Sequence, residues 1–151
     1  MPNEGLRLNK ALSRAREVAA QLGPATDRLN ALLQAVETAL AELQLGVAGY
    51  ARMNEKNPEW AQMLTFCKFG NTWQLMIESG PDGGDPEDFS STPLCNASRE
   101  LRLQAVDYLP QLIENLVNEA TAQAKTVQAK TLQVAEILAE LRGGASNDKS
   151  I

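Results

Sequence analysis

The chain has 151 residues, enough for one compact domain or one domain with an extension. Nineteen Asp and Glu residues against fourteen Lys and Arg residues give a net charge of −5, and the excess lies in segment 78–88, which has no basic residue. This acidic balance disfavours nucleic-acid binding, and no apolar run approaches the roughly 20 residues of a membrane-spanning helix. We therefore expect an acidic, cytoplasmic protein that binds neither nucleic acid nor membrane, because the first residues also lack the apolar core of a signal peptide.

The residue types and motifs that carry common chemistry are missing. The chain has no His, which excludes Ser-His-Asp and Cys-His nucleophile systems and His-ligated zinc. It also has no Walker-type phosphate loop, no GxGxxG, no CxxC and no GxSxG motif. Cys67 and Cys95 do not form a metal-binding spacing and are expected to be free thiols. We expect no catalytic residue, no cofactor and no metal site.

A heptad pattern defines the first part of the chain, residues 1–43. Its members are separated by alternating steps of four and three residues, and all but one are apolar. They are Leu8, Leu12, Ala15, Ala19, Leu22, Thr26, Leu29, Leu33, Val36, Leu40 and Leu43. Such spacing predicts a helix with one narrow apolar seam that a second helix covers. Gly23-Pro24 lies inside the pattern without shifting its phase, which favours two nearly collinear helical pieces with a kink or short break between them.

Residues 44–109 form a predicted head that contains a three-stranded β-meander. Alternation of apolar and other residues predicts a strand over 45–53. Gly70-Asn71 is typical of a two-residue hairpin turn, and this turn fixes the register of the two strands beside it. The predicted pairs are Phe69 with Thr72, Lys68 with Trp73, Cys67 with Gln74, Phe66 with Leu75, Thr65 with Met76, Leu64 with Ile77, and Met63 with Glu78.

A loop over 79–93 and a short helix complete the head. The carboxylates at 82, 85, 87 and 88 do not match the spacing of an EF-hand, so we interpret the loop as a solvated acidic segment fixed by Phe89. Ser98 is predicted to cap a short helix that ends near Tyr108. Arg99 and Arg102 on this helix, together with the acidic loop 78–88, are the candidate ligand site, or they form an ion pair with that loop.

A second heptad pattern occupies the predicted C-terminal helix, residues 110–142. Its members are Ile113, Val117, Ala120, Ala124, Val127, Thr131, Val134, Leu138 and Leu141. Pro110 is expected to separate this helix from the short helix before it. Gly143-Gly144 is expected to end the helix, and residues 143–151 are expected to be a disordered tail.

Two apolar seams at opposite ends of one chain predict that they cover each other. The predicted fold is mainly α with a small antiparallel sheet (α+β), a long antiparallel helical hairpin or coiled-coil stalk carrying the head, with paired residue numbers that sum to about 153. Leu33 then meets Ala120. A compact α+β domain, in which the helices wrap the sheet, is the alternative. The sequence leaves open whether the seams pair within one chain or between chains.

A second apolar row lies beside the first seam at heptad spacing: Ala11, Val18, Ala25, Leu32 and Ala39. It widens the stripe beyond what one helix covers, so we expect a homo-oligomer, most simply a homodimer, formed by the N-terminal helices. The expected function is that of a non-enzymatic structural or protein-interaction protein, a stalk that presents its head to an unidentified protein partner. The alternative is a small enzyme or ligand-binding protein that uses the head, the acidic loop and Arg99/Arg102.

Overall fold

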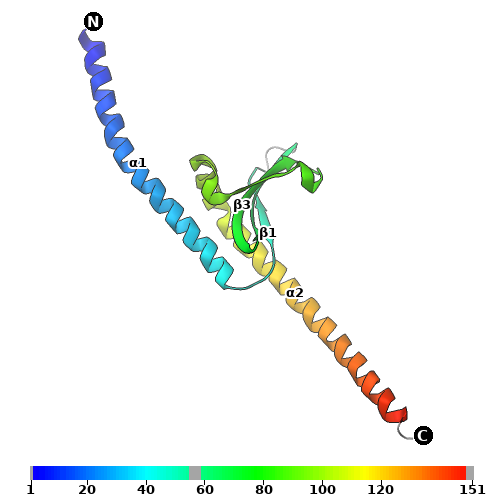
Figure 1. Ribbon diagram of the computed structural model, residues 1–151. Helices are drawn as coiled ribbons and strands as arrows, with labels where there is room; N and C mark the ends of the chain where they lie inside the picture. Colours follow the sequence, from blue (N-terminus) through cyan, green and yellow to red (C-terminus); the bar gives the residue numbers. More distant parts are fainter. Residues whose placement is uncertain (1, 55–58, 149–151) are drawn as a thin grey trace.

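The computed structural model of the chain describes residues 2–54 and 59–148, and it is a mixed α+β fold with two long helices and one antiparallel sheet (Figure 1). In chain order the elements are α1 (Pro2–Glu42), β1 (Gly49–Arg52), β2 (Trp60–Phe69), β3 (Thr72–Pro81), the 3₁₀ turn η1 (Pro86–Asp88), β4 (Ser90–Pro93), the 3₁₀ turn η2 (Leu94–Asn96) and α2 (Arg99–Asp148). The strands follow one another across the sheet in chain order.

The β2–β3 hairpin confirms the predicted register at every pair. Phe69 lies opposite Thr72 and Phe66 lies opposite Leu75, as the two-residue turn requires. Gly70 has a φ of 63°, the left-handed conformation that glycine adopts without the steric penalty of a Cβ atom. Alternate residues of the two strands therefore present their large apolar side chains to the same face, the face that forms the core.

The sheet has four strands, and the prediction of three was wrong. The fourth strand, β4, pairs with β3 from Ser79↔Ser90 to Met76↔Pro93, within the segment predicted to be loop. Its residues Ser90, Ser91 and Thr92 are exposed, so it lacks the alternation of buried and exposed side chains that marks a strand in sequence. The first strand is shorter than predicted, because positive φ angles at Gln44 and Gly46 place residues 44–47 in a turn and a connection.

Helix α1 continues through Gly23-Pro24 as one helix, where two nearly collinear pieces with a kink or short break were predicted. Proline has no N–H, so the carbonyl of Ala20 lacks its usual helical partner, and the ring crowds the preceding turn. Figure 1 shows α1 bending along its N-terminal half, which is the expected effect of an internal proline. The Thr26 hydroxyl donates a 2.7 Å hydrogen bond to the carbonyl of Leu22 in the same region.

Helix α2 is also continuous, and the predictions of a break at Pro110 and an end at Gly143-Gly144 were wrong. Its start was predicted correctly, since the Ser98 hydroxyl accepts a 3.2 Å hydrogen bond from the N–H of Leu101. The side chains of Ala105 and Leu112, on either side of Pro110, are fully buried in the core. This packing holds the helix together across a proline that costs about 3 kcal/mol in an isolated helix.

The two helices do not form an antiparallel hairpin. Both run from upper left to lower right in Figure 1, side by side at the head, so the chain termini lie at opposite ends of the molecule. Arg102 donates a hydrogen bond to the Asn30 side chain, which places the start of α2 beside the second half of α1. Both helices pack on one face of the sheet, α2 on β1 and β2, and α1 on β3. The sheet thus takes the covering role that the sequence assigned to the other helix.

Candidate interaction surface

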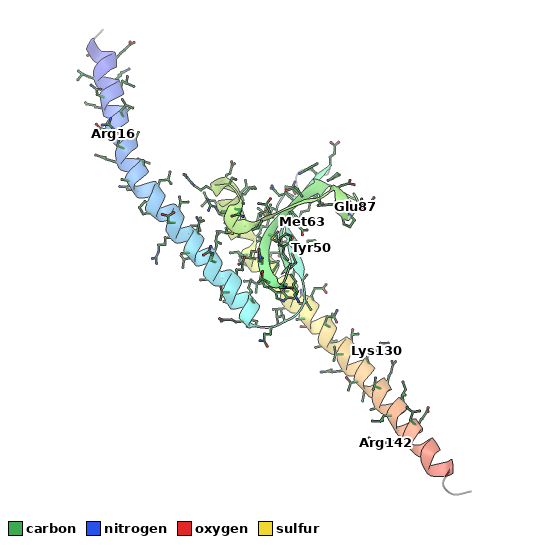
Figure 2. All side chains as sticks on the ribbon, viewed as in Figure 1. Arg16, Tyr50, Met63, Glu87, Lys130 and Arg142 are labelled. Carbon is green, nitrogen blue, oxygen red and sulfur yellow. The ribbon has the colours of Figure 1, made fainter. Side chains whose placement is uncertain are left out.

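Two helical arms extend beyond the head, and every side chain described on them is exposed. The N-terminal arm is residues 3–25 of α1, and the C-terminal arm is residues 121–144 of α2. At 1.5 Å per residue, each arm is about 35 Å long. Figure 2 shows their side chains projecting into solvent, with Arg16 on one arm and Lys130 and Arg142 on the other. The arms are of nearly equal length and leave the head in opposite directions.

The heptad positions of α1 divide into a covered and an uncovered half. In the head, Leu33 and Leu40 are buried, and Leu29 and Val36 pack against the same core. On the N-terminal arm the same row continues with no covering element, and its large members are exposed: Leu8, Leu12 and Leu22. The sheet therefore covers this heptad row over half its length, and the other half is exposed.

Helix α2 uses a different face in the head from the one that forms its heptad row. Ala105, Leu112 and Leu116 are buried against the sheet. Leu103, Val106, Ile113 and Val117 are exposed. These four exposed residues stand in phase with the row on the C-terminal arm. These residues and the row on the C-terminal arm form one surface, which we call the α2 seam. Its members are Leu103, Val106, Pro110, Ile113, Val117, Ala120, Ala124, Val127, Thr131, Val134, Leu138 and Leu141.

The sequence predicted the α2 seam without its first quarter, the residues Leu103, Val106 and Pro110. The predicted row starts at Ile113, because Pro110 indicates a helix boundary and separates Leu103 and Val106 into a short helix of their own. Subtracting seven from Ile113 gives Val106, so the continuation was present in the spacing. Proline is a strong helix-breaking signal in sequence. Its effect is small in a folded protein where the residues on either side of it pack tightly.

The predicted oligomer row on α1, which we call the α1 row, is exposed along its whole length. Its members are Ala11, Val18, Ala25, Leu32 and Ala39. Leu32 is 53% exposed, whereas the neighbouring Leu33, which points to the sheet, is 6% exposed. The α1 row therefore lies on a flank of the helix that the head leaves open.

The acidic segment 78–88 is split between strand β3 and a folded turn. Asp82 forms a 3.3 Å ion pair with Arg52 on β1, and the Asp88 carboxylate accepts a 3.3 Å hydrogen bond from the N–H of Asp85. Phe89 lies directly over Gly80, where an added Cβ would come within 2.7 Å of its ring. This contact confirms that Phe89 fixes the loop to the sheet. Among the described residues, no three His, Cys, Asp or Glu side chains come together as a metal-binding group.

The structure does not bring Arg99 and Arg102 together with the acidic loop. Figure 1 shows the start of α2 and the turn that precedes β4 on different sides of the sheet, and Glu87 is labelled in that turn in Figure 2. Arg102 bonds to Asn30 of α1, and the loop's Asp82 pairs with Arg52 instead. Arg99 is exposed on the first turn of α2. Arg102 is therefore a link between the two helices.

The hollows on the head bring together few titratable groups. One hollow of about 320 Å³ lies between β1 and α2 and is lined by Ala48, Gly49, Tyr50, Asn115, Asn118 and Glu119. Within it, the Asn115 amide donates a 2.8 Å hydrogen bond to the carbonyl of Tyr50, so this amide joins helix to strand. Elsewhere on the sheet, burial and the nearby Glu78 carboxylate raise the pKa of the Cys67 thiol, which lowers the fraction of reactive thiolate at a given pH.

Comparisons with known proteins gave no match: no family model, no curated protein and no solved structure is significantly similar to the chain. No helix in the described part of the chain is long and apolar enough to cross a membrane. The heptad rows on the two arms are apolar surfaces that no described part of the head covers.

Proposed function

We propose that this chain is a non-enzymatic structural or protein-interaction protein, in which the two helical arms build a homo-oligomer and the sheet forms a head for a protein partner. The observation that carries the proposal is the exposure of in-phase heptad rows along both arms. These rows lie within residues 3–25 and 121–144, where every described side chain is exposed. A homodimer is the simplest assembly that covers either row.

The physical argument concerns the stability of the arms. Most of the stability of protein helices comes from packing an apolar face, and neither arm has such packing within one chain. Leu8, Leu12, Val127 and Leu138 are among the large side chains that are 45–60% exposed there. Covering an aliphatic side chain contributes about 1.5–3 kcal/mol. Helical arms with heptad spacing acquire that stabilisation from a second helix, which another chain supplies.

The α1 row supports the oligomer through the N-terminal helices. Ala11, Val18 and Ala25 widen the apolar face of the arm beyond one seam, and small Ala side chains allow two helices to approach closely. Both cysteines are free thiols, which fits a reducing compartment, so we place the assembly in the cytoplasm. Exposed aromatic residues on the head, Tyr50 and Phe69, offer contact area to a protein partner.

Multi-angle light scattering of the purified chain tests the proposal. We expect a dimer or larger oligomer at micromolar concentration and a helical circular-dichroism signal that falls on dilution as the arms lose their partners. Leu32→Glu is expected to weaken the oligomer without unfolding the head, since Leu32 does not contact the core. Gln34→Glu, on the same stretch of α1, is the matched control and should leave the mass unchanged. A wild-type monomer with fully helical arms contradicts the proposal.

A further inference from the structure

We infer that helix α2 pairs with α2 of a second copy of the chain, antiparallel, about a two-fold axis that passes beside Ala122. The inference rests on the proposed function, because it names the partner of one of the two bare surfaces. It starts from the α2 seam, which is open to solvent from Leu103 to Leu141 and is not the face that holds α2 to the sheet. A second helix can therefore lie along the whole seam without displacing the head.

The seam is self-complementary when two copies run in opposite directions. In antiparallel coiled coils the two heptad positions face each other, and a pairing with residue numbers that sum to 244 matches every member of the seam to another. The layers are Leu103 with Leu141, Val106 with Leu138, Pro110 with Val134, Ile113 with Thr131, Val117 with Val127, and Ala120 with Ala124. The two-fold axis repeats each layer. The small alanines then meet at the centre, where they permit close approach of the two helix backbones.

The charges near the centre of α2 do not meet one another in this pairing. Glu119 and Lys125 lie at heptad positions that face away from the partner helix. Glu114 and Lys130 lie on opposite flanks of the seam, so Glu114 is set beside Gln128 of the second copy and Lys130 beside its Leu116. Charge complementarity in this register therefore comes from the ends of the seam.

The outer flanks of the seam support the same register. Glu100 and Arg142 occupy equivalent heptad positions next to the seam, and the pairing brings them face to face across the helix interface. Both are exposed in the single chain. On the other flank, Leu109 meets Ile137, an apolar pair. No like charges meet at the flanking positions in this pairing.

A parallel pairing of the same seam fits less well. Parallel two-stranded coils prefer β-branched residues at the first apolar heptad position and Leu at the second. The α2 seam departs from this order at six positions, with Val106, Ile113, Val127 and Val134 at the second position and Leu103 and Leu138 at the first, while Val117, Thr131 and Leu141 follow it. In-register parallel pairing also stacks Pro110 on Pro110 and Thr131 on Thr131. The antiparallel arrangement sets Pro110 opposite Val134 and Thr131 opposite Ile113 instead.

Disulfide trapping tests direction and register in the full-length chain, with both native cysteines replaced by Ser. A chain carrying Val106→Cys is mixed with a chain carrying Leu138→Cys, and the two are oxidised mildly after subunit exchange. We expect a mixed disulfide between the two chains, because these positions form one layer. Leu138→Cys alone is the control: its two copies lie about 48 Å apart in the antiparallel pair. A disulfide between two Leu138→Cys chains, or no mixed disulfide, overturns the inference.

A charge introduced in the seam tests the surface independently of any disulfide. Val127→Glu is expected to raise the dimer dissociation constant at least about hundredfold, because it buries two carboxylates opposite Val117. Ala129→Glu, on the outward side of the same arm, is the matched control and should leave the constant unchanged. Both positions are exposed in the single chain, so circular dichroism of the head should be the same for both.

The outcomes separate this inference from the proposed function. If Val127→Glu stays dimeric and Leu32→Glu becomes monomeric, the assembly uses the α1 row and the α2 pairing is wrong. If Val127→Glu becomes monomeric and the mixed disulfide forms, the α2 pairing is supported. If the wild-type chain is a monomer with fully helical arms, both are wrong.

Discussion

The carboxylate of Glu37 accepts a 2.9 Å hydrogen bond from the backbone N–H of Leu75. Leu75 lies on β3 opposite Phe66, one residue before the point where β4 begins to pair with β3 at Met76. The N–H of Leu75 therefore points to the edge of β3 that pairs with β4, but β4 does not extend as far as Leu75. Glu37 of α1 supplies the acceptor that β4 would otherwise provide. This bond fixes the position of α1 against the sheet edge.

Replacing Glu37 with Ala should lower the free energy of unfolding by about 1–3 kcal/mol, because the N–H of Leu75 loses its acceptor in a partly buried place. Glu37→Gln keeps an acceptor oxygen and should cost less. Glu42→Ala, at the exposed end of α1, is the control and should be near neutral. Urea denaturation at a fixed protein concentration measures all three, and equal midpoints for Glu37→Ala and Glu42→Ala would show that the bond is not stabilising.

Gly49→Ala should destabilise the head by about 1–3 kcal/mol, the usual cost of adding a methyl group to a filled core. An added Cβ at Gly49 would lie 2.9 Å from a methyl carbon of Leu116, which is itself 1% exposed. Gly143→Ala should have the opposite sign, a gain of about 0.5–1 kcal/mol, since Gly143 is in an exposed helix with nothing within 4 Å. Thermal unfolding of the two variants provides the comparison, and a stabilised Gly49→Ala would be the contrary result.

Leu33 and Leu32 are adjacent in sequence and should respond to the same change in different assays. Leu33→Ala should cost about 2–5 kcal/mol of unfolding free energy, because it leaves a cavity between α1 and the sheet. Leu32→Ala removes a side chain that the head does not touch, so its effect should appear in the oligomer dissociation constant. Chemical denaturation at low protein concentration, paired with sedimentation analysis, separates the two effects. Equal loss of folding stability in both variants would contradict the assignment of faces.

Cys67 should be alkylated more slowly than Cys95 at neutral pH. Desolvation and the Glu78 carboxylate raise the pKa of the Cys67 thiol, so less thiolate is present at any given pH, and its rate should keep rising to a higher pH than that of an ordinary thiol. Glu78→Gln removes one cause and should bring the profile to lower pH. Iodoacetamide labelling followed by mass spectrometry reads each thiol. In denaturant the two should react alike, and the same equality in the native protein would refute the prediction.

The hairpin register was determined by the sequence, because a two-residue Gly-Asn turn leaves one way to align the strands beside it. The cap at Ser98 and the role of Phe89 were also local properties, and local sequence predicted them. Helix α1 shows the limit of such reasoning. Its heptad row predicts that the face from Leu29 to Leu40 is covered, but it does not predict which element covers that face.

The tertiary structure decided what covers each face and in which direction the helices run. The sheet covers α1 from Leu29 to Leu40, the face that the heptad row of α2 was predicted to cover. Helix α2 instead contributes Ala105, Leu112 and Leu116 to the core. The strand β4 forms from residues with no apolar alternation, because β3 offers it a free edge. Hydrophobic burial is non-directional, so spacing alone specifies an apolar face, and the packed arrangement of all elements selects its partner.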